Sequence, residues 1–478
     1  MPLPECDHKI IQLSQSLEGL MSIRDTPISL QSDSPEDLRN LINTHRIDEV
    51  ECTISDIHGV ARGKLMPASK FSSLNPTFLP YSIFFQSITG DYFEFDSEEY
   101  MTEVDVKLEP DFSTLRALPW ARSPSLMVIH DLYFQDGRPV SCSPRHVLRR
   151  ILDCYAEKVW KPVVAPEIEF YLTEKNVNPD EPLRPPVGRS GRQSVGRQSF
   201  SMMAIDEYEP IIEDIYLFAE AQGLEIDTLT QEGGPAQLEI NMAHGDPMLM
   251  ADQVFVFKRL IREAAMRHDC YATFMAKPMS NHPGSAMHIH QSVVDLKTGQ
   301  NIFSDPSGEP SDLFHYFIGG QQKYLGPAAC MLAPYVNSYR RFTTEDSAPI
   351  NLKWSRDNRS AGLRVPNSGP NSRRVENRIA GMDTNPYLAM AASLATGFLG
   401  MTQQNNCQKE FKGDAHEEPF GLPRGLLESL IMFDKAPELQ SLLGQSFCDL
   451  YKALKAHEFN EHMMVVSPWE REHLLLTV

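Results

Sequence analysis

The chain has 478 residues and a formal net charge of −20, with 41% hydrophobic and 23% charged residues. This length exceeds one small core and indicates two domains or one large one. The acidic balance argues against a general binder of nucleic acids or membrane surfaces. The sequence also lacks both a basic start followed by an apolar run and any segment near the ~18 apolar residues of a membrane span.

The eight cysteines are scattered and form no C-x-x-C pair. A structural zinc site is therefore not expected. A reducing, cytoplasmic compartment is the simplest one for this chain, and no nucleic-acid or membrane partner is expected.

The N-terminal part divides into an extension and a small domain. Residues 1–35 are polar and weakly periodic, which is typical of an extension. Residues 48–55 alternate as a strand does, and a turn follows at Asp56. We predict a small β-rich domain over residues 36–141 and a larger domain over residues 142–478.

The larger part mixes helical and strand patterns. Ser143 is followed by a proline and by helical spacing, so a helix starts here with a serine cap. Residues 176–199 are rich in proline, glycine and arginine and predict a surface loop. Amphipathic helices are predicted over residues 206–222 and 247–268. A helix rich in small residues begins at Asn385.

Four short segments carry charged, amide or imidazole side chains on every second residue, with apolar side chains between them. On a strand, residues i and i+2 share a face, so each segment predicts a strand with one apolar and one polar face. Charged groups are costly to bury unless they are paired or bound to a cation. Together the four polar faces predict a cavity that binds metals and anions. The segments are residues 163–172, 236–242, 287–293 and 373–379, and their polar faces carry Glu167, Glu169, Gln237, Glu239, Asn241, His288, His290, Ser292, Arg374, Glu376 and Arg378.

The candidate metal ligands are five carboxylates and one imidazole. Converging carboxylates cannot all ionise without cations, and hard oxygen ligands with one histidine suit Mg²⁺ or Mn²⁺ better than zinc. Six ligands are enough for two divalent ions. Taken alone, each strand is more typical of an exposed sheet face, and a lone histidine is more often structural. The six residues are Glu167, Glu169, Glu232, Glu239, His288 and Glu376.

Arginine is concentrated between residues 340 and 378. Guanidinium groups bind phosphate and carboxylate in a bidentate way. Arginines beside two metals therefore fit phosphoryl transfer, where catalysis is mostly positioning and charge neutralisation. By itself such a run is usually a solvated basic face. The chain has no Walker A lysine motif and no kinase signature set, so a nucleotide must bind in another way.

These motifs occur in the order of the glutamine synthetase family, which the chain resembles from about residue 40. The resemblance implies an α+β fold, with a small N-terminal β-grasp-like domain and a large C-terminal catalytic domain built on a curved antiparallel sheet. It also implies a ring homo-oligomer, expected as two stacked hexamers, with active sites between subunits. The matching segments are Glu167-Ile-Glu-Phe-Tyr, Glu232-(x6)-Glu239, Lys277-Pro, Gly284-Ser-Ala-Met-His288-Ile-His290, Asn337-Ser-Tyr-Arg-Arg341, Asn358-Arg359-Ser-Ala-Gly-Leu-Arg364-Val-Pro, Arg374-Val-Glu376-Asn-Arg378 and Asn385-Pro-Tyr-Leu.

The resemblance implies a role for each site residue in a two-step reaction. The γ-carboxylate of L-glutamate attacks the γ-phosphorus of ATP, and an amine then displaces phosphate from γ-glutamyl phosphate. One metal would be held by Glu169, Glu232 and Glu239, and a second by Glu167, His288 and Glu376. ATP would be bound by His290, Ser292, Arg359, Arg364 and Arg374, and glutamate by Gly284, His288, Arg341 and Arg378. Asp56 would reach a neighbouring subunit's site and help to deprotonate the amine, which makes Asp56, Arg359 and Glu232 the expected catalytic set.

The amine site departs from the family's ammonia-using members. They have a glutamate six residues after the arginine that aligns with Arg341, and this chain has Ser347 there. A neutral, smaller serine removes a negative wall that suits ammonium and leaves room for a substituent on nitrogen. Glu345 or Asp346 takes the glutamate's place if the register shifts. The asparagine before the family's Gly-Ser pair is Pro283 here, which weakens one glutamate contact.

The serine makes the chain similar to the γ-glutamyl amide ligases, which couple glutamate to organic amines such as putrescine, polyamines or aniline. A polyamine or alkylamine is the first expectation, with a role in amine catabolism. Aromatic residues in 81–85 and 92–95 leave an arylamine such as aniline open, although core packing is the simpler interpretation of them. Two other classes stay open, an ammonia-assimilating glutamine synthetase and a non-catalytic structural relative.

Overall fold

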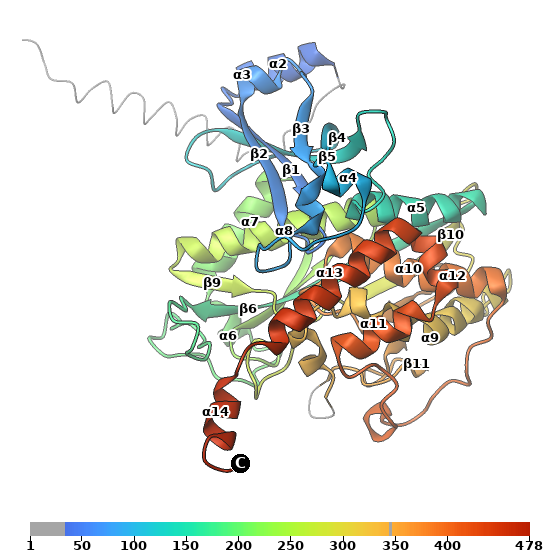
Figure 1. Cartoon of the computed structure of the whole chain (residues 1–478). Helices are drawn as coiled ribbons and strands as arrows, with labels where there is room; N and C mark the ends of the chain where they lie inside the picture. The colour runs from blue at the N-terminus through green and yellow to red at the C-terminus, as the bar shows by residue number, and fades with distance from the viewer. Residues whose placement is uncertain (1–33, 344–346) are drawn as a thin grey trace, which may run out of the picture.

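The computed structural model describes residues 34–343 and 347–478, and it contains two sheets that form the smaller upper and the larger lower part of Figure 1. The upper sheet has five strands in the order β2-β1-β5-β4-β3. In it β1 and β5 pair in parallel, and the other neighbours are antiparallel. This agrees with the predicted small β-rich domain. Its strands are β1 (Glu49–Ser55), β2 (Ala61–Pro67), β3 (Thr77–Pro80), β4 (Asp105–Ala117) and β5 (Ser125–Phe134).

The predicted first strand and its turn are confirmed. Val50, Cys52 and Ile54 of β1 are buried on one face, as a strand on a core requires, and at the end of the strand Thr53 and Ser55 on the other face are buried too. The turn closes after Ser55, where the Asp56 backbone N–H donates to the Val60 carbonyl at 3.1 Å.

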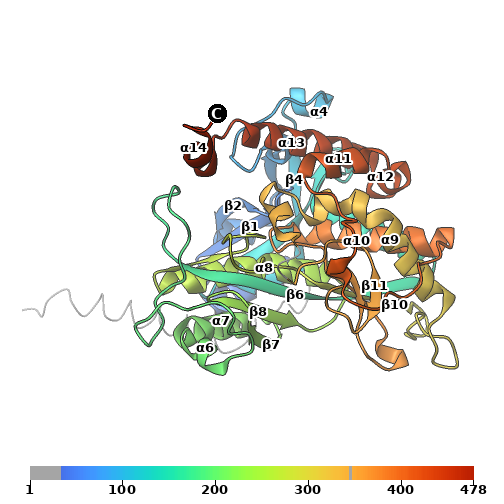
Figure 2. The same ribbon diagram turned by 90° about the horizontal axis from the view of Figure 1, so that it is seen from below.

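The lower sheet has eight strands, seven of them on the path β11-β12-β13-β10-β6-β8-β7, with β9 paired to β6. Figure 2 shows β6 crossing this sheet, with β7 and β8 beside it. The pairing is antiparallel as expected, except that the short strands β11 and β12 pair in parallel. The strands are β6 (Trp160–Glu174), β7 (Ile226–Gln231), β8 (Gln237–Met242), β9 (Cys270–Thr273), β10 (Ile289–Asp295), β11 (Trp354–Arg356), β12 (Leu363–Val365) and β13 (Val375–Asn377).

The structure has helices in both parts of the chain. The predicted helices and the predicted surface loop over residues 176–199 are confirmed. Ser143 stands at the cap position of α5, but its side chain makes no capping hydrogen bond. The α-helices are α2 (Pro35–Thr44), α3 (Ala68–Phe71), α4 (Glu98–Met101), α5 (Pro144–Glu157), α6 (Met202–Asp206), α7 (Glu209–Ala221), α8 (Pro247–Arg267), α9 (Asp312–Leu332), α10 (Pro386–Gln403), α11 (Leu426–Asp434), α12 (Pro437–Leu443), α13 (Gln445–Met463) and α14 (Pro468–Leu474). The 3₁₀ helices are η1 (Tyr81–Phe85), η2 (Asn337–Arg341), η3 (Pro370–Ser372) and η4 (Ala415–Glu417).

Helix α10 is the centre of the larger core. Every residue from Pro386 to Met401 is buried, as expected for a helix that is apolar on all sides. It packs against α9, and the two backbones approach closely, because a Cβ on Gly320 would lie 2.4 Å from the Gly400 Cα. Asn385 caps the helix by accepting hydrogen bonds from the backbone of Tyr387 and Leu388.

A buried ionic cluster ties the upper sheet to the larger part. Arg145 of α5 donates to Asp111 of β4 at 2.7 Å, to Asp131 of β5 at 2.9 Å and to Asp252 of α8 at 3.0 Å. Loss of one partner would leave a buried charge unpaired, which is the costly way to break such a cluster. The cluster thus fixes the small sheet against α5 and α8.

The aromatic residues of the small domain form its core. Phe84 and Phe85 are buried, and Phe85 contacts Tyr81, Phe93 and Tyr100 with ring centroids 4.4–5.9 Å apart. The core-packing interpretation of residues 81–85 is therefore confirmed.

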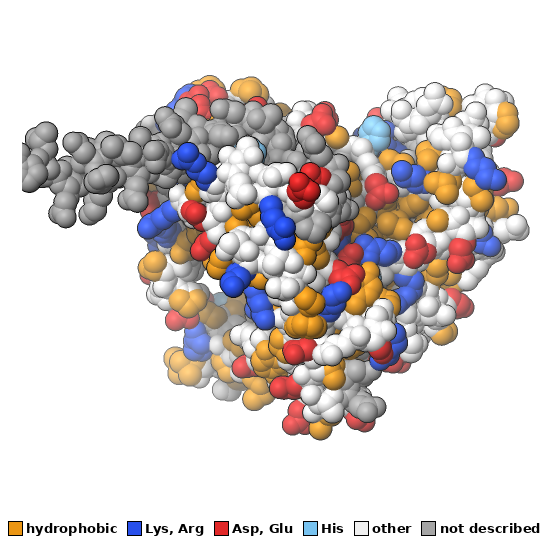
Figure 3. Space-filling model, turned by 90° about the horizontal axis from the view of Figure 1, so that it is seen from above, with side chains coloured by type: hydrophobic (Ala, Val, Ile, Leu, Met, Phe, Trp, Pro, Cys, Tyr) orange, Lys and Arg blue, Asp and Glu red, His pale blue; other side chains and the backbone are white. Residues whose placement is uncertain are grey.

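The surface of the small domain is mixed in charge. Seen from above, acidic and basic side chains are interspersed over the part of this face that the structure describes (Figure 3). Within residues 34–343 and 347–478, no helix combines the length and the apolar character that a bilayer crossing requires. The domain boundaries at residues 35 and 141 stay a prediction, and most of the predicted extension lies outside the described residues.

Candidate active site

Strands β6 and β8 bring two glutamates face to face. In their antiparallel register Glu169 lies opposite Glu239, and Glu167 lies opposite Asn241. The alternate residues Ile168 and Ile240 are fully buried on the other face, as the period of two predicts. Like charges directly opposite each other destabilise a sheet, so this register needs a compensating cation or a proton.

Strands β10 and β13 extend the same polar face. His290 lies opposite Glu376, and the Glu167 backbone N–H donates to the His288 carbonyl at 2.9 Å. The Glu167 carboxylate contacts both imidazoles, with His288 Nδ1 at 2.9 Å and His290 Nε2 at 3.0 Å. The predicted convergence of the strands from 163–172, 236–242, 287–293 and 373–379 is therefore confirmed.

Two groups of side chains have the geometry to hold a cation. Each group has one ligand atom per residue, and these atoms lie within 4.8 Å of one another. Five of the six expected ligands belong to these groups, and His288 is shared between them. Glu232 is in neither group, although its charge acts on Glu169 and Glu239. The groups are Glu167, His288 and Glu376, and Glu169, Glu239 and His288.

Burial and neighbouring charges raise the pKa values of some groups in the cluster and lower those of others. Burial and the charge of Glu232 raise the pKa of Glu169 to about 8, and burial with the neighbouring carboxylates raises the pKa of Glu239 to about 9. Against burial, the Arg378 guanidinium lowers the pKa of Glu376 to about 2. Burial and Arg378 lower the pKa of His288 to about 4, which leaves a neutral imidazole that can ligate a metal.

We expect the metal-free protein to lose stability as pH rises from about 4.5 to about 9. Glu169 and Glu239 have an ordinary pKa of 4.5 and folded values near 8 and 9. In this window the folded state binds more protons than the unfolded state, so the free energy of unfolding falls with rising pH. Thermal melts in a chelator measure the slope, and added Mg²⁺ should remove most of it.

The matched control for this titration is the double variant Glu169→Gln/Glu239→Gln. Its amides imitate the protonated acids, so its melting temperature should change much less over the same window. An equally steep decline in this variant would assign the pH dependence to other groups.

Arginines surround the cluster on the β12 and β13 side. Arg364 donates to Glu376 at 2.7 Å and to Asp357 at 2.8 Å, and Arg378 donates to Glu376 at 2.6 Å. Arg374 Nε donates to His290 Nδ1 at 3.2 Å. Three of the arginines expected to bind ligands thus touch the metal-binding face.

A cavity of about 480 Å³ opens beside this face. His290, Ser292 and Arg374 line it, together with Glu167 and Asn241. These three are expected ATP ligands, so the structure gathers them around one space next to the carboxylates. Arg359 is exposed and lines no wall of this cavity, but its charge acts on Glu232.

Gly284 and Arg341, two of the expected glutamate residues, lie against each other. A Cβ on Gly284 would lie 2.4 Å from the Ala276 carbonyl oxygen and 2.7 Å from Arg341 Cγ, so only glycine fits against Arg341. Arg341 is buried and donates to the backbone carbonyls of Arg378 and Ile379 at 2.8 Å. Gly284, Arg341 and Arg378 are therefore neighbours.

Two expected amine-site residues lie apart from the cluster. Asp56 is 1% exposed, and its carboxylate accepts hydrogen bonds from the backbone of His58 and Val60 and from Arg62, each at 2.9 Å. Ser347 is exposed, and it borders the segment with Glu345 and Asp346, which lies outside the described residues. Within one subunit, no described contact joins Asp56 to the carboxylates.

Two supporting residues were not assigned from the sequence. Gln237 donates to the Gly284 carbonyl at 3.0 Å, and the Tyr171 hydroxyl donates to the Pro283 carbonyl at 2.6 Å. Both therefore hold the loop that carries Gly284. The period of two that places Glu169 also places Tyr171 on the same face, so the signal was present in the sequence.

Comparison with known proteins gives the family. A family model described as "Glutamine synthetase, catalytic domain" matches residues 141–474. The chain belongs to the glutamine synthetase family. This family uses ATP and divalent metals, and the protein is an ATP-dependent glutamate–amine ligase. The expected α+β glutamine synthetase-like fold is confirmed.

Two relatives of this glutamine synthetase family member are named for amines. "Gamma-glutamylputrescine synthetase PuuA" of Escherichia coli (strain K12) is 34% identical over 435 residues, which cover 89% of this chain and 91% of the relative. "Glutamate--isopropylamine ligase" of Pseudomonas sp is 30% identical over 454 residues, which cover 91% and 96%. A "Glutamine synthetase" of Halobacterium salinarum is 29% identical over 469 residues, 95% of this chain and 99% of the relative.

A solved structure has the same fold. The structure named "GmaS/ADP complex-Conformation 1" superposes with a TM-score of 0.78 at 24% identity, covering 92% of this chain and 99% of that chain. At this identity the likeness bears on the fold alone.

Proposed function

We propose that the protein joins the γ-carboxylate of L-glutamate to the nitrogen of an organic primary amine, with cleavage of ATP to ADP and phosphate. The observation that carries this proposal is the convergence of four carboxylates, two imidazoles and several arginines on one sheet face beside a cavity. The names of the two amine-ligating relatives support it.

The metal site fits Mg²⁺ or Mn²⁺, with two or more ions per active site. Carboxylate oxygens dominate both ligand groups, and hard oxygen donors suit these ions. The pKa values of Glu169 and Glu239 are raised mainly by burial and by the neighbouring carboxylates, and a bound cation would offset both effects. We assign one ion to Glu169, Glu232 and Glu239 and another to Glu167, His288 and Glu376. When bound, these ions neutralise the charge on the phosphates.

The protein residues position the two substrates of the first step. His290, Ser292 and Arg374 would bind ATP in the adjacent cavity, with Arg359 and Arg364 at its phosphates. Gly284, His288, Arg341 and Arg378 would hold glutamate, so that its γ-carboxylate oxygen attacks the γ-phosphorus and ADP leaves. Catalysis here is positioning and charge stabilisation.

The second step forms the amide. The amine nitrogen attacks the carbonyl carbon of γ-glutamyl phosphate, the C–O bond to phosphate breaks, and the nitrogen loses a proton. We assign that proton to Asp56 of a neighbouring subunit. Arg359 would stabilise the leaving phosphate. Glu232, which we assign to one of the metal ions, is the third proposed catalytic residue.

The amine is proposed to be a polyamine or an alkylamine, with an arylamine such as aniline as the second choice. Ser347 is a neutral residue at the proposed amine site, where ammonia-using members have a glutamate. The absence of that negative charge disfavours ammonium as the substrate. Burial of the rings at residues 81–85 in the core removes one argument for an arylamine. We place the reaction in amine catabolism and, on the cysteine usage of the sequence, in the cytoplasm.

An ammonia-assimilating glutamine synthetase is the second candidate function, because relatives at 29% identity carry that name. A panel of putrescine, spermidine, ethanolamine, isopropylamine, aniline and ammonium separates the two functions. ATP- and glutamate-dependent phosphate release is measured with each. Ammonium turnover equal to that of every amine would overturn the amine proposal.

The active form is proposed to be a ring in which Asp56 completes a neighbour's site, because Asp56 contacts no described residue of its own carboxylate cluster. The resemblance to the family makes two stacked hexamers the expected ring. Neither Asp56→Ala nor Arg359→Ala subunits should be active alone. Mixed at equal amounts in a head-to-tail ring, they should recover about a quarter of the wild-type activity, since that share of interfaces carries two intact halves.

The control for subunit mixing pairs Asp56→Ala with a subunit that carries both substitutions. That mixture has no interface with two intact halves and should stay inactive. If verified mixing of the two single variants restores nothing, Asp56 does not complete a neighbour's site.

A further inference from the structure

The turn that carries Asp56 is held by the catalytic part of its own chain at two places. The first is Asn385, whose side-chain amide donates to the Asp56 carbonyl at 2.8 Å, to the Ser55 hydroxyl at 3.1 Å and to the Ile57 carbonyl at 3.3 Å. This contact fixes the backbone of the turn but leaves the His58 side chain unaccounted for.

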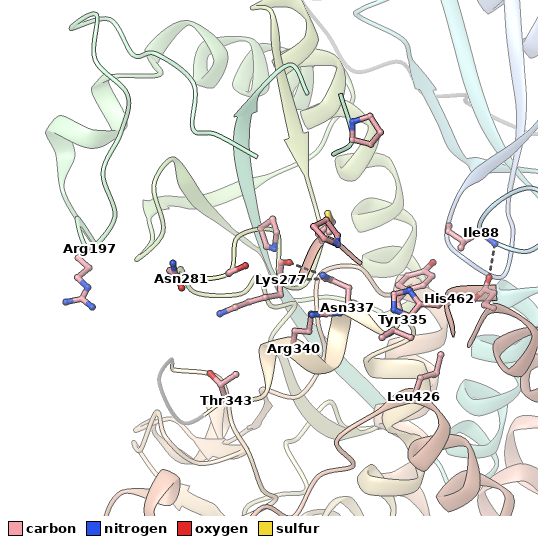
Figure 4. Close-up of a pocket in the computed structure, with 17 residues that line it drawn as sticks. Ile88, Arg197, Lys277, Asn281, Tyr335, Asn337, Arg340, Thr343, Leu426 and His462 are labelled. Carbon is pink, nitrogen blue, oxygen red and sulfur yellow. Dashed lines mark hydrogen bonds between the residues drawn. The ribbon is translucent and has the colours of Figure 1, made fainter. Parts of the chain in front are cut away.

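The second contact comes from Glu458 in α13. Glu458 Oε1 lies 2.5 Å from His58 Nε2, and it also accepts the Ile88 backbone N–H at 2.8 Å. Figure 4 shows this bond to Ile88 at one edge of a cavity of about 1070 Å³, which Glu458 and Tyr335 help to line. A single carboxylate oxygen therefore holds two separate segments of the small domain.

The other Glu458 oxygen is neutralised by a buried lysine. Lys455 Nζ donates to Oε2 at 2.8 Å, and the two side chains are 1% and 4% exposed. Lys455 Nζ also lies 4.3 Å from the centre of the Tyr335 ring, on which His58 stacks at 6.3 Å. Against burial, Lys455 and His58 lower the pKa of Glu458 to about 2, so this group is ionised at every working pH.

His58 connects this group to Asp56. Its backbone N–H donates to Asp56 Oδ1 at 2.9 Å, and its Nδ1 lies 3.9 Å from Asp56 Oδ2. The His58 ring therefore lies between two carboxylates, with Nε2 at Glu458 and Nδ1 on the side of Asp56. A shift of His58 would thus move its backbone N–H, which is one of the three donors that fix the Asp56 carboxylate.

We propose that Glu458 is a positioning residue for amide formation: by holding His58 and the Ile88 backbone, it sets where the Asp56 carboxylate lies. This role rests on the proposed function of Asp56 as the acceptor of the amine proton. Buried hydrogen-bonded charges of this kind hold functional groups in one arrangement. The residues expected to bind ATP, metal and glutamate lie on or beside strands of the larger sheet, in loops or in η2, and have no described contact with Glu458.

Paired substitutions separate positioning from folding. Lys455→Met/Glu458→Gln removes both charges and keeps an acceptor oxygen for His58, while Lys455→Met/Glu458→Leu removes that acceptor too. Neither leaves an unpaired buried charge, the costly outcome of changing Glu458 alone. The leucine variant should lose about 100-fold in kcat for the amine, the effect of misplacing a reacting group by about 1 Å, and the glutamine variant should regain much of it.

The first step serves as an internal readout. Positional isotope exchange in ATP labelled at the β,γ-bridge oxygen reports γ-glutamyl phosphate formation without any amine. It should stay within about twofold of wild type in both variants, as should the KM values for ATP and glutamate. Glu461→Gln is the matched control, since Glu461 lies one turn on and reaches Thr89 rather than His58.

Each outcome is decisive. Equal losses of isotope exchange and amide formation in the leucine variant would show a general structural role and overturn the proposal, as would wild-type amide formation. A wild type that catalyses exchange but forms no amide with any amine would instead overturn the proposed function, and the role of Glu458 with it.

Discussion

Replacing Glu239 by glutamine is expected to reduce glutamate-dependent phosphate release by roughly 1,000-fold or more, and Glu169→Gln should do the same. Each change removes one anionic ligand from a face where Glu169 and Glu239 stand directly opposite each other. A charge contact to the developing phosphate in a desolvated site is worth about 4 kcal/mol, and that corresponds to about 10³ in rate. Steady-state phosphate release in excess Mg²⁺ measures the loss, with binding of the metal followed calorimetrically.

The matched control is Glu174→Gln, at the end of β6, the strand that carries Glu169. Glu174 accepts a hydrogen bond from Gln193 at 2.7 Å and belongs to neither ligand group. It should keep nearly full activity, and all three variants should elute as the wild-type oligomer. Near wild-type activity of Glu239→Gln in Mg²⁺ would refute the two-metal assignment.

The second large effect is expected at Ser347. Ser347→Glu should shift the preference from organic amines toward ammonium by roughly thirty- to several-hundred-fold, because one such charge contact is worth ~2–4 kcal/mol in a partly desolvated site. Ser347 is exposed in the single chain, so this expectation assumes that a neighbouring subunit covers it. The ratio of kcat/KM for ammonium and for the best amine of the panel measures the shift.

Ser347→Gln separates charge from size. Glutamine fills the same space as glutamate but carries no charge. It should therefore weaken the binding of bulky amines without improving the turnover of ammonium. If glutamine and glutamate at this position shift the preference equally, steric exclusion rather than charge decides the amine. The pH dependence of the wild-type rate of amide formation indicates the class of amine. A steep rise from pH 7 to 9 points to an alkylamine, whose pKa is about 10.4, and a flat profile points to an arylamine.

Much of the candidate site could be predicted because strand alternation is a local property. The spacing of Glu167 and Glu169 put both carboxylates on one face, and β6 has that arrangement. The same spacing does not tell which strand pairs with which, or in what register. That Glu169 faces Glu239, and that His290 faces Glu376, depends on a register between strands that are far apart in the chain.

The aromatic residues show the opposite case. Core packing was the simpler interpretation of Tyr81 and Phe85, but a wall for an aromatic amine stayed open, because composition does not tell which side of a short 3₁₀ helix is covered. Packing against Phe93 and Tyr100 decided it. The serine at position 143 was predicted to cap α5, and it stands at the cap position, but its side chain makes no capping hydrogen bond.

By itself the sequence determined the polar and apolar faces of the strands, the helix positions and the ligand types, since these follow from periods of two and 3.6 residues and from side-chain chemistry. The tertiary structure decided which faces meet and how deeply they are buried. Desolvation raises the pKa values of Glu169 and Glu239, and it exists only once the surrounding core has formed. The contact between His58 and Glu458, 400 residues apart, likewise arises only when α13 packs against the small domain.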